Sequence, residues 1–289
     1  MSAAPTFGRN FKVDRKAKPV PFESCASCWL FPLNLCANFR RDHGKIRDVR
    51  SPLWRTMPAE SQVLFEGDVA DRLLVLSEGW AFRYKMLPDG RRQVIDFVLP
   101  GDTLMVPGGG LRGASHSIES ITPITLCSFS TDQVSNLIAQ SPGFAASLLT
   151  VEGEVAARVT DHFLSVGRRR ALERMAHLLV EIYLRLKHCG LNNGHSFEFP
   201  ARQQIIGDAL GLTHEHVCRL RRRLNDMGIA EFYRDKVTIL DFEWLSKIGG
   251  TEDGYKDGPI RPKTLLGQRV LAALSSVCIP FSSLVPAFL

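Results

Sequence analysis

One short polar stretch, residues 202–224, carries the side chains best suited to recognising a nucleic acid. Glu215 and Arg219 stand four residues apart, so a helix would present both on one face. An arginine can donate twice to guanine O6 and N7, and a carboxylate can accept from the N4 amino group of cytosine. The pair therefore suits the reading of a G·C base pair.

The residues around this pair predict two short helices joined by a tight turn. Apolar residues recur at helical intervals: Ile205, Ile206, Ala209 and Leu210 in the first helix, and Val217, Leu220 and Leu224 in the second. Gly211 allows the positive φ that a short turn needs, and Thr213 is a good N-cap for the second helix. This is the pattern of a helix-turn-helix whose second helix enters the major groove. The spacing alone would equally fit an ordinary helix pair, but the outward Glu215–Arg219 pair favours DNA.

The candidate contacts divide into two groups. The candidates for base reading are Glu215, Arg219, Cys218 and His214, and those for phosphate binding are Arg202, Thr213, Arg221, Arg222 and Arg223. An exposed thiol near a helix N-terminus and beside arginines is also a candidate for oxidation. A redox role for Cys218 therefore stands beside the simpler interpretation of a residue without a sensing role.

The stretch Leu210-Gly211-Leu212-Thr213-x-Glu215-x-Val217-x-Arg219 resembles the reading helix of the Crp/Fnr superfamily of bacterial transcription regulators, closest to its Fnr/FixK branch. The resemblance implies that Glu215 and Arg219 read the G·C pair of a TGA-containing half-site within a TTGA-like palindrome. It also implies double-stranded DNA and RNA polymerase as partners. The branch usually has serine where this chain has Cys218, and a thiol donates more weakly than a hydroxyl.

Composition fits a two-domain globular protein with a basic surface. The chain has 289 residues, 45% hydrophobic and 23% charged, with a formal net charge of +6. A basic balance suits a polyanionic partner. The N-terminal residues lack the apolar run of a signal peptide, and the seven cysteines are an odd number, so we expect a reducing, cytoplasmic setting.

Residues 1–50 read as a basic arm and a cysteine-rich segment that contains Cys25, Cys28 and Cys36. Thiolates grouped in this way bind iron–sulfur clusters or zinc. Residues 51–140 consist of short strands separated by Gly/Asp turns, which predict a β-sandwich or jelly roll. Three turns resemble those of the Crp/Fnr sensor domain, a cyclic-nucleotide-binding-like roll: Phe65-Glu66-Gly67-Asp68, Gly79 and Pro100-Gly101-Asp102.

The resemblance bears on cofactors in two ways. Cys127 lies where Fnr-type oxygen sensors have a fourth cluster ligand, so Cys25, Cys28, Cys36 and Cys127 are candidates for a [4Fe–4S] cluster. Zinc and a metal-free, FixK-like protein remain alternatives, as does a regulator that binds a small molecule in its roll. Residues 105–114 lack the Glu and the Arg-Ser pair with which cyclic-nucleotide members bind the phosphate, so no cAMP is expected.

Residues 141–166 predict a long helix with an apolar seam, made of Leu148, Leu149, Val155, Val159, Phe163 and Leu164. By resemblance this is a dimerisation helix, although packing on its own sandwich is an alternative. Gly167 marks an expected hinge, and residues 167–248 predict a winged helix-turn-helix with a hairpin around Tyr233-Arg234-Asp235. Residues 249–289 form an appended tail without an assigned role, with a helix expected near 264–277. Its prolines Pro280 and Pro286 argue against a membrane span.

The sequence therefore predicts an α+β protein: a sensor roll, a long helix and a winged helix-turn-helix, paired as a homodimer. The predicted function is transcription regulation in response to oxygen or redox state. No Ser/His/Asp set, P-loop or HExxH motif is present, so an enzyme is not expected.

Overall fold

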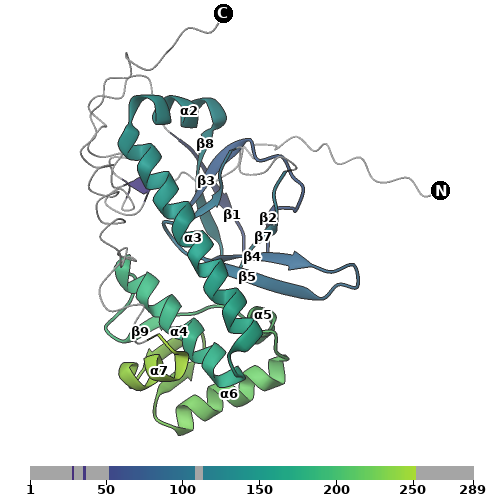
Figure 1. Cartoon of the computed structure of the whole chain (residues 1–289), viewed down its shortest axis with the longest axis vertical. Helices are drawn as coiled ribbons and strands as arrows, with labels where there is room; N and C mark the ends of the chain where they lie inside the picture. Colours follow the sequence, from purple (N-terminus) through teal and green to yellow (C-terminus); the bar gives the residue numbers. More distant parts are fainter. Residues whose placement is uncertain (1–27, 29–34, 37–51, 108–112, 252–289) are drawn as a thin grey trace, which may run out of the picture.

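A computed structural model of the chain describes residues 28, 35–36, 52–107 and 113–251. Residues 52–107 and 113–130 form two antiparallel sheets, with strand orders β1-β8-β3-β6 and β2-β7-β4-β5 (Figure 1). The strands are β1 (Leu53–Met57), β2 (Gln62–Leu64), β3 (Arg72–Glu78), β4 (Ala81–Met86), β5 (Arg92–Val98), β6 (Thr103–Met105), β7 (Ser117–Ser120) and β8 (Ile124–Ser130). The predicted β-sandwich is confirmed.

The turn after β3 depends on Gly79. Its φ is +87°, and a Cβ at this position would lie 2.2 Å from the carbonyl oxygen of Pro123. Only glycine accepts both the conformation and the close approach. Behind this turn, the interior of the roll is apolar because alternate strand residues point inward. Its fully buried members include Leu76, Val98 and Ile118.

Two helices follow the roll: α2 (Thr131–Gln140) and α3 (Pro142–Arg168) (Figure 1). The expected hinge at Gly167 is not observed, since α3 continues through this residue. A glycine near a helix end costs only about 1 kcal/mol relative to alanine, so it need not end the helix. The break comes at Arg169 and Arg170, where the backbone N–H of Arg170 donates to the carboxylate of Glu173 at 2.8 Å and starts the next helix.

The predicted seam of α3 divides between two faces. Leu148 is buried against the roll, together with Phe144 and Val151. Leu149 and Phe163 point the other way and are 73% and 81% exposed. One side of the helix therefore packs on its own sandwich, as one of the two alternatives predicted, and dimerisation through the exposed residues stays a prediction.

The C-terminal domain combines helices with a small sheet. Its elements are α4 (Ala171–His188), β9 (Ser196–Glu198), α5 (Gln203–Leu210), α6 (His214–Asp226), β10 (Ala230–Tyr233), β11 (Lys236–Ile239) and α7 (Phe242–Gly249). The strands pair in the order β10-β11-β9, so the predicted hairpin wing is present with a third strand beside it. Helix α7, which packs on α4, was not predicted. The α+β class with a winged helix-turn-helix is confirmed.

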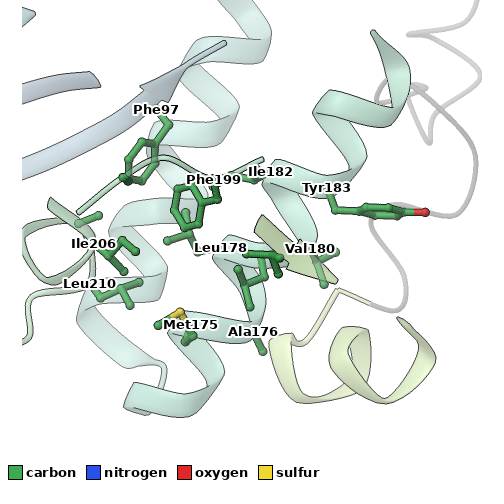
Figure 2. Packing of buried hydrophobic residues seen from close by; sticks show 14 of the residues in the cluster. Phe97, Met175, Ala176, Leu178, Val180, Ile182, Tyr183, Phe199, Ile206 and Leu210 are labelled. Atoms are coloured by element: carbon green, nitrogen blue, oxygen red, sulfur yellow. The ribbon is translucent and has the colours of Figure 1, made fainter. Parts of the chain in front are cut away.

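The roll and the C-terminal domain share one hydrophobic core. Figure 2 shows Phe97 of β5 beside residues of the C-terminal domain, including Phe199 and Ile206. The ring centroids of Phe97 and Phe199 lie 5.4 Å apart, and those of Trp80 and Phe199 lie 5.7 Å apart. The outer face of β4 and β5 is therefore covered by the C-terminal domain. None of the described helices is long and apolar enough to cross a bilayer. Residues 252–289, with the expected tail helix, lie outside the described residues.

Candidate DNA-binding interface

The turn between α5 and α6 fixes how the second helix is presented. Gly211 has a φ of +64°, and the hydroxyl of Thr213 accepts from the backbone N–H of His216 at 3.4 Å as the N-cap. Both features were predicted. Gly207 was not: a Cβ there would lie 2.6 Å from the carbonyl oxygen of Leu212. The close approach of α5 to the following turn leaves space only for glycine.

One face of α6 anchors the helix. Val217, Leu220 and Leu224 are at most 5% exposed and belong to the shared core, as the sequence predicted. Because these positions recur every three or four residues, they form a single stripe. The opposite face of α6 must then point to solvent.

The exposed face of α6 carries the four base-reading candidates together: His214, Glu215, Cys218 and Arg219. The imidazole Nε2 of His214 lies 3.2 Å from Oε1 of Glu215. Hydrogen bonds from its own backbone N–H and from Thr213 lower the pKa of Glu215. The carboxylate is therefore ionised at neutral pH, which is the form that accepts from cytosine N4.

Cys218 is exposed on the same face, and its thiol donates to the side-chain oxygen of Gln203 at the start of α5. This hydrogen bond joins α6 to α5, the two helices of the helix-turn-helix. Any modification of the Cys218 sulfur would remove the donor and place new atoms on the exposed face of α6.

The phosphate candidates have different surroundings. Arg222 and Arg223 are exposed on α6. The guanidinium of Arg221 stacks over the ring of Phe232 at 4.7 Å, and burial lowers its pKa. Arg202 forms an ion pair with Glu60 of the roll. Arg202 therefore has an intramolecular partner with which a phosphate would compete, a feature that the sequence did not indicate.

The cysteine candidates are partly brought together. Cys127 lies on β8 between Trp54 of β1 and Val75 of β3, and it is buried in the same cluster as Cys28 and Leu35. Cys36 follows Leu35 and is half-buried. Cys25 lies outside the described residues. Within residues 28, 35–36, 52–107 and 113–251, no three His, Cys, Asp or Glu side chains form a metal-binding group.

Comparisons with known proteins agree with this architecture. The profile of the Crp-like helix-turn-helix domain matches residues 173–248, and that of the cyclic nucleotide-binding domain matches residues 54–141. The transcriptional activatory protein AadR of Rhodopseudomonas palustris is 36% identical over 178 residues, which cover 61% of this chain and 72% of AadR. The chain belongs to the Crp/Fnr family of transcription regulators.

Two FixK proteins place it near the Fnr/FixK branch of the Crp/Fnr family. The nitrogen fixation regulation protein FixK of Rhizobium meliloti is 34% identical over 180 residues, covering 62% of this chain and 77% of FixK. The solved structure of FixK2 from Bradyrhizobium japonicum matches 69% of this chain and 98% of its own with a TM-score of 0.63 and 25% identity. The chain is thus a DNA-binding regulator and not an enzyme.

Proposed function

We propose that this Crp/Fnr protein acts as a homodimer that reads a TTGA-like palindrome with the α6 helices of its two subunits. The observation that carries the proposal is the exposure of Glu215 and Arg219 on one face of a helix anchored from behind. Twofold symmetry would present two such faces to half-sites about one helical turn apart. Arg222 and Arg223 would add contacts to phosphate, which raise affinity without selecting a sequence.

The exposed side of α3 supports dimerisation. Six exposed residues follow one another at alternating spacings of four and three, namely Leu149, Gly153, Ala156, Thr160, Phe163 and Gly167. This is the spacing of a and d positions in a two-stranded coiled coil. The small residues would let two helices approach closely, and the two large apolar side chains would fill the contact. An exposed apolar stripe of this kind favours a second copy of α3 as its partner.

DNA binding can be tested by fluorescence anisotropy on a labelled palindromic duplex and on a scrambled duplex of equal length. We expect tight binding to the palindrome only, with a dissociation constant that rises steeply with salt. A stoichiometry of two chains per duplex is expected. Equal affinity for both duplexes would refute sequence-specific reading.

For the signal, we propose a [4Fe–4S] cluster held by Cys25, Cys28, Cys36 and Cys127. The support is that Cys28 and Cys127, although 99 residues apart in sequence, belong to one buried cluster with the neighbour of Cys36. When bound, such a cluster reacts with oxygen and redox agents. Its thiolates would fix the N-terminal segment against β8 and the start of α3, because Phe144 and Leu148 pack in the same place.

Anaerobic purification followed by iron and acid-labile sulfide determination tests the cluster. We expect both elements in the parent protein and their loss in Cys127→Ser. Cys189→Ser is the matched control, because Cys189 is a half-buried cysteine at the end of α4, away from the proposed set. An iron-free parent, or a Cys127→Ser variant with full iron, would exclude this cluster.

If iron is absent, the second candidate is a cluster-free, FixK-like regulator controlled by Cys218. The exposed thiol and its bond to Gln203 favour this site. Oxidation to a sulfinate would add a negative charge facing phosphate. Peroxide should then abolish DNA binding of the parent but not of Cys218→Ala. A regulator that binds a small molecule in the roll is the remaining alternative.

We further propose that the protein activates transcription by contacting RNA polymerase. The support is that AadR is named as an activator of transcription. In vitro transcription from a promoter carrying the palindrome tests this: added protein should increase the transcript. A decrease would identify a repressor.

A further inference from the structure

Six charged side chains, each at most 14% exposed, meet where the roll, α3 and α4 pack together. They are Arg83 of β4, Asp96 of β5, Asp102 in the turn before β6, Arg158 of α3, and Glu181 and Arg185 of α4. We call this group the junction cluster. It contains three guanidinium groups and three carboxyl groups. None of these residues belongs to the DNA-binding face or to the proposed cysteine set.

Asp96 is the centre of the junction cluster. Its Oδ2 lies 2.6 Å from Arg83 and 3.2 Å from Arg158, and its Oδ1 lies 3.3 Å from Arg185. Burial alone would raise the pKa of Asp96, but the surrounding guanidinium groups lower it well below its ordinary value. Asp96 is therefore ionised, and its charge depends on arginines from three different elements.

Asp102 is shared by the same two helices. Its Oδ2 lies 2.5 Å from Arg185 of α4, and its Oδ1 lies 3.5 Å from Arg158 of α3. The carboxylates of the roll thus bind one arginine from the long helix and one from the DNA-binding domain at the same time. A change at one guanidinium must alter the field that the other experiences, because both face the same two charges at close range.

The two arginines are held unequally. Arg185 also donates to the carbonyl oxygen of Phe97 at 2.8 Å and pairs with Glu181 at 3.0 Å. Arg158 has only the two longer contacts, and its Nε is buried without a hydrogen-bond partner among the described residues. The ion pairs of Arg158 should therefore separate more easily than those of Arg185.

Buried ion pairs seldom stabilise a fold more than apolar residues of the same size would, so stability alone does not account for this cluster. Their distinctive property is that removing one partner leaves an uncompensated buried charge. We propose that the junction cluster couples α3 to the DNA-binding domain: withdrawal of Arg158 from Asp96 and Asp102 changes how Arg185 holds α4 on the roll.

The inference rests on the DNA-binding function and on α3 as the element that moves, but not on the identity of the signal. Arg158→Met tests it, since methionine keeps an unbranched apolar stem and removes the guanidinium charge. Hydrogen–deuterium exchange of the full-length protein is measured in α6 and α7, which contain no residue of the junction cluster. Lys187→Met is the matched control, because Lys187 is an exposed cation of α4 outside the cluster.

We expect Arg158→Met to change the exchange rates of α6 or α7 severalfold. We also expect it to weaken binding to the palindrome by about 2- to 30-fold, whereas Lys187→Met changes neither. Changes confined to α3 and β5 with unaltered DNA affinity would overturn the proposal, as would tighter DNA binding. If Arg158→Met does not fold, Arg158→Lys is assayed, since its single ammonium group reaches one carboxylate in place of two. If the parent fails to bind the palindrome, the proposed function fails, while the exchange comparison still decides the coupling.

Discussion

Arg92 of β5 and Asp208 of α5 form an ion pair of 2.9 Å between the roll and the first helix of the helix-turn-helix. The same guanidinium lies over the rings of Phe82 and Tyr84, at 4.9 and 5.4 Å from their centroids. Next to it, the side chain of Gln93 donates to the carbonyl oxygen of Ala209 at 3.1 Å. Helix α5 is thus fixed to the roll, and the face of α6 that carries Glu215 and Arg219 is left exposed.

This ion pair should contribute measurably to stability. The two side chains are 20% and 23% exposed, so a thermodynamic cycle with Arg92→Gln and Asp208→Asn should give a coupling of about 1 kcal/mol in urea denaturation. The control pair is Arg91 and Asp89, whose side chains are 77% and 53% exposed and whose coupling should be close to zero. If the Arg92–Asp208 coupling were no larger than that of the control pair, this contact between the roll and α5 would not stabilise the fold.

Substitution of Arg219 should reduce specificity more than affinity for DNA in general. Arg219→Ala removes two donors to guanine, which corresponds to about 1–3 kcal/mol of discrimination, or about 5- to 150-fold in the dissociation constant for the palindrome. Arg219→Lys should restore charge but not the paired donors. Binding to the scrambled duplex should change little in either variant.

Glu215→Gln provides a separate test of the cytosine contact. The amide keeps the size of the side chain but adds donors where only an acceptor fits, so we expect preference for the G·C pair to fall. Glu243→Gln on α7 is the control, because it removes another exposed carboxylate from a different helix. A Glu215→Gln protein with unchanged preference would exclude this residue from base reading.

Some features of the interface could be predicted from the sequence because they depend on residues close along the chain. The buried stripe of Val217, Leu220 and Leu224 and the cap at Thr213 follow from helical periodicity and local hydrogen bonding. Gly207 could not be predicted, since its requirement arises from the approach of the Leu212 carbonyl oxygen, which depends on the turn geometry.

Features that depend on packing between distant parts of the chain were harder to predict from the sequence. The apolar pattern of α3 located Leu148 and Leu149 but did not show that Leu148 is buried and Leu149 exposed. Phe82 and Tyr84 alternate with Arg83 on β4, a pattern typical of a strand with one buried and one solvated face. Both faces are buried, because the DNA-binding domain covers the outer side of the strand. Sequence periodicity identifies the apolar face of a helix or strand, but it does not identify the element that packs on that face.

The two sides of α3 should respond differently to substitution. Phe163→Asp changes an exposed side chain, so the unfolding free energy of the monomer should change little while sedimentation velocity shows loss of the dimer. Leu148→Ala removes a side chain that is 8% exposed and should cost about 2–4 kcal/mol without dissociating the dimer. A Phe163→Asp protein that remains dimeric would place the dimer contact elsewhere.

Acidification should destabilise the contact between α4 and α7 through His177. Burial lowers the pKa of His177 from 6.5 to about 4, and the ring Nδ1 lies 3.3 Å from the carbonyl oxygen of Gly249. Because the folded protein holds this histidine neutral, its contribution is complete above pH 6.5 and is lost as the pH falls from 6.5 towards 4. From pH 7 to pH 5 the parent should lose about 2 kcal/mol through this residue.

Burial lowers the pKa of His116 to about 4 as well, so His116 adds a loss of the same sign in every variant. Urea denaturation at the two pH values should therefore show a smaller loss in His177→Asn than in the parent. The exposed His188 of the same helix serves as the control, and His188→Asn should lose as much stability as the parent. An identical loss in all three proteins would mean that His177 is protonated in the native state without consequence for the packing of α7.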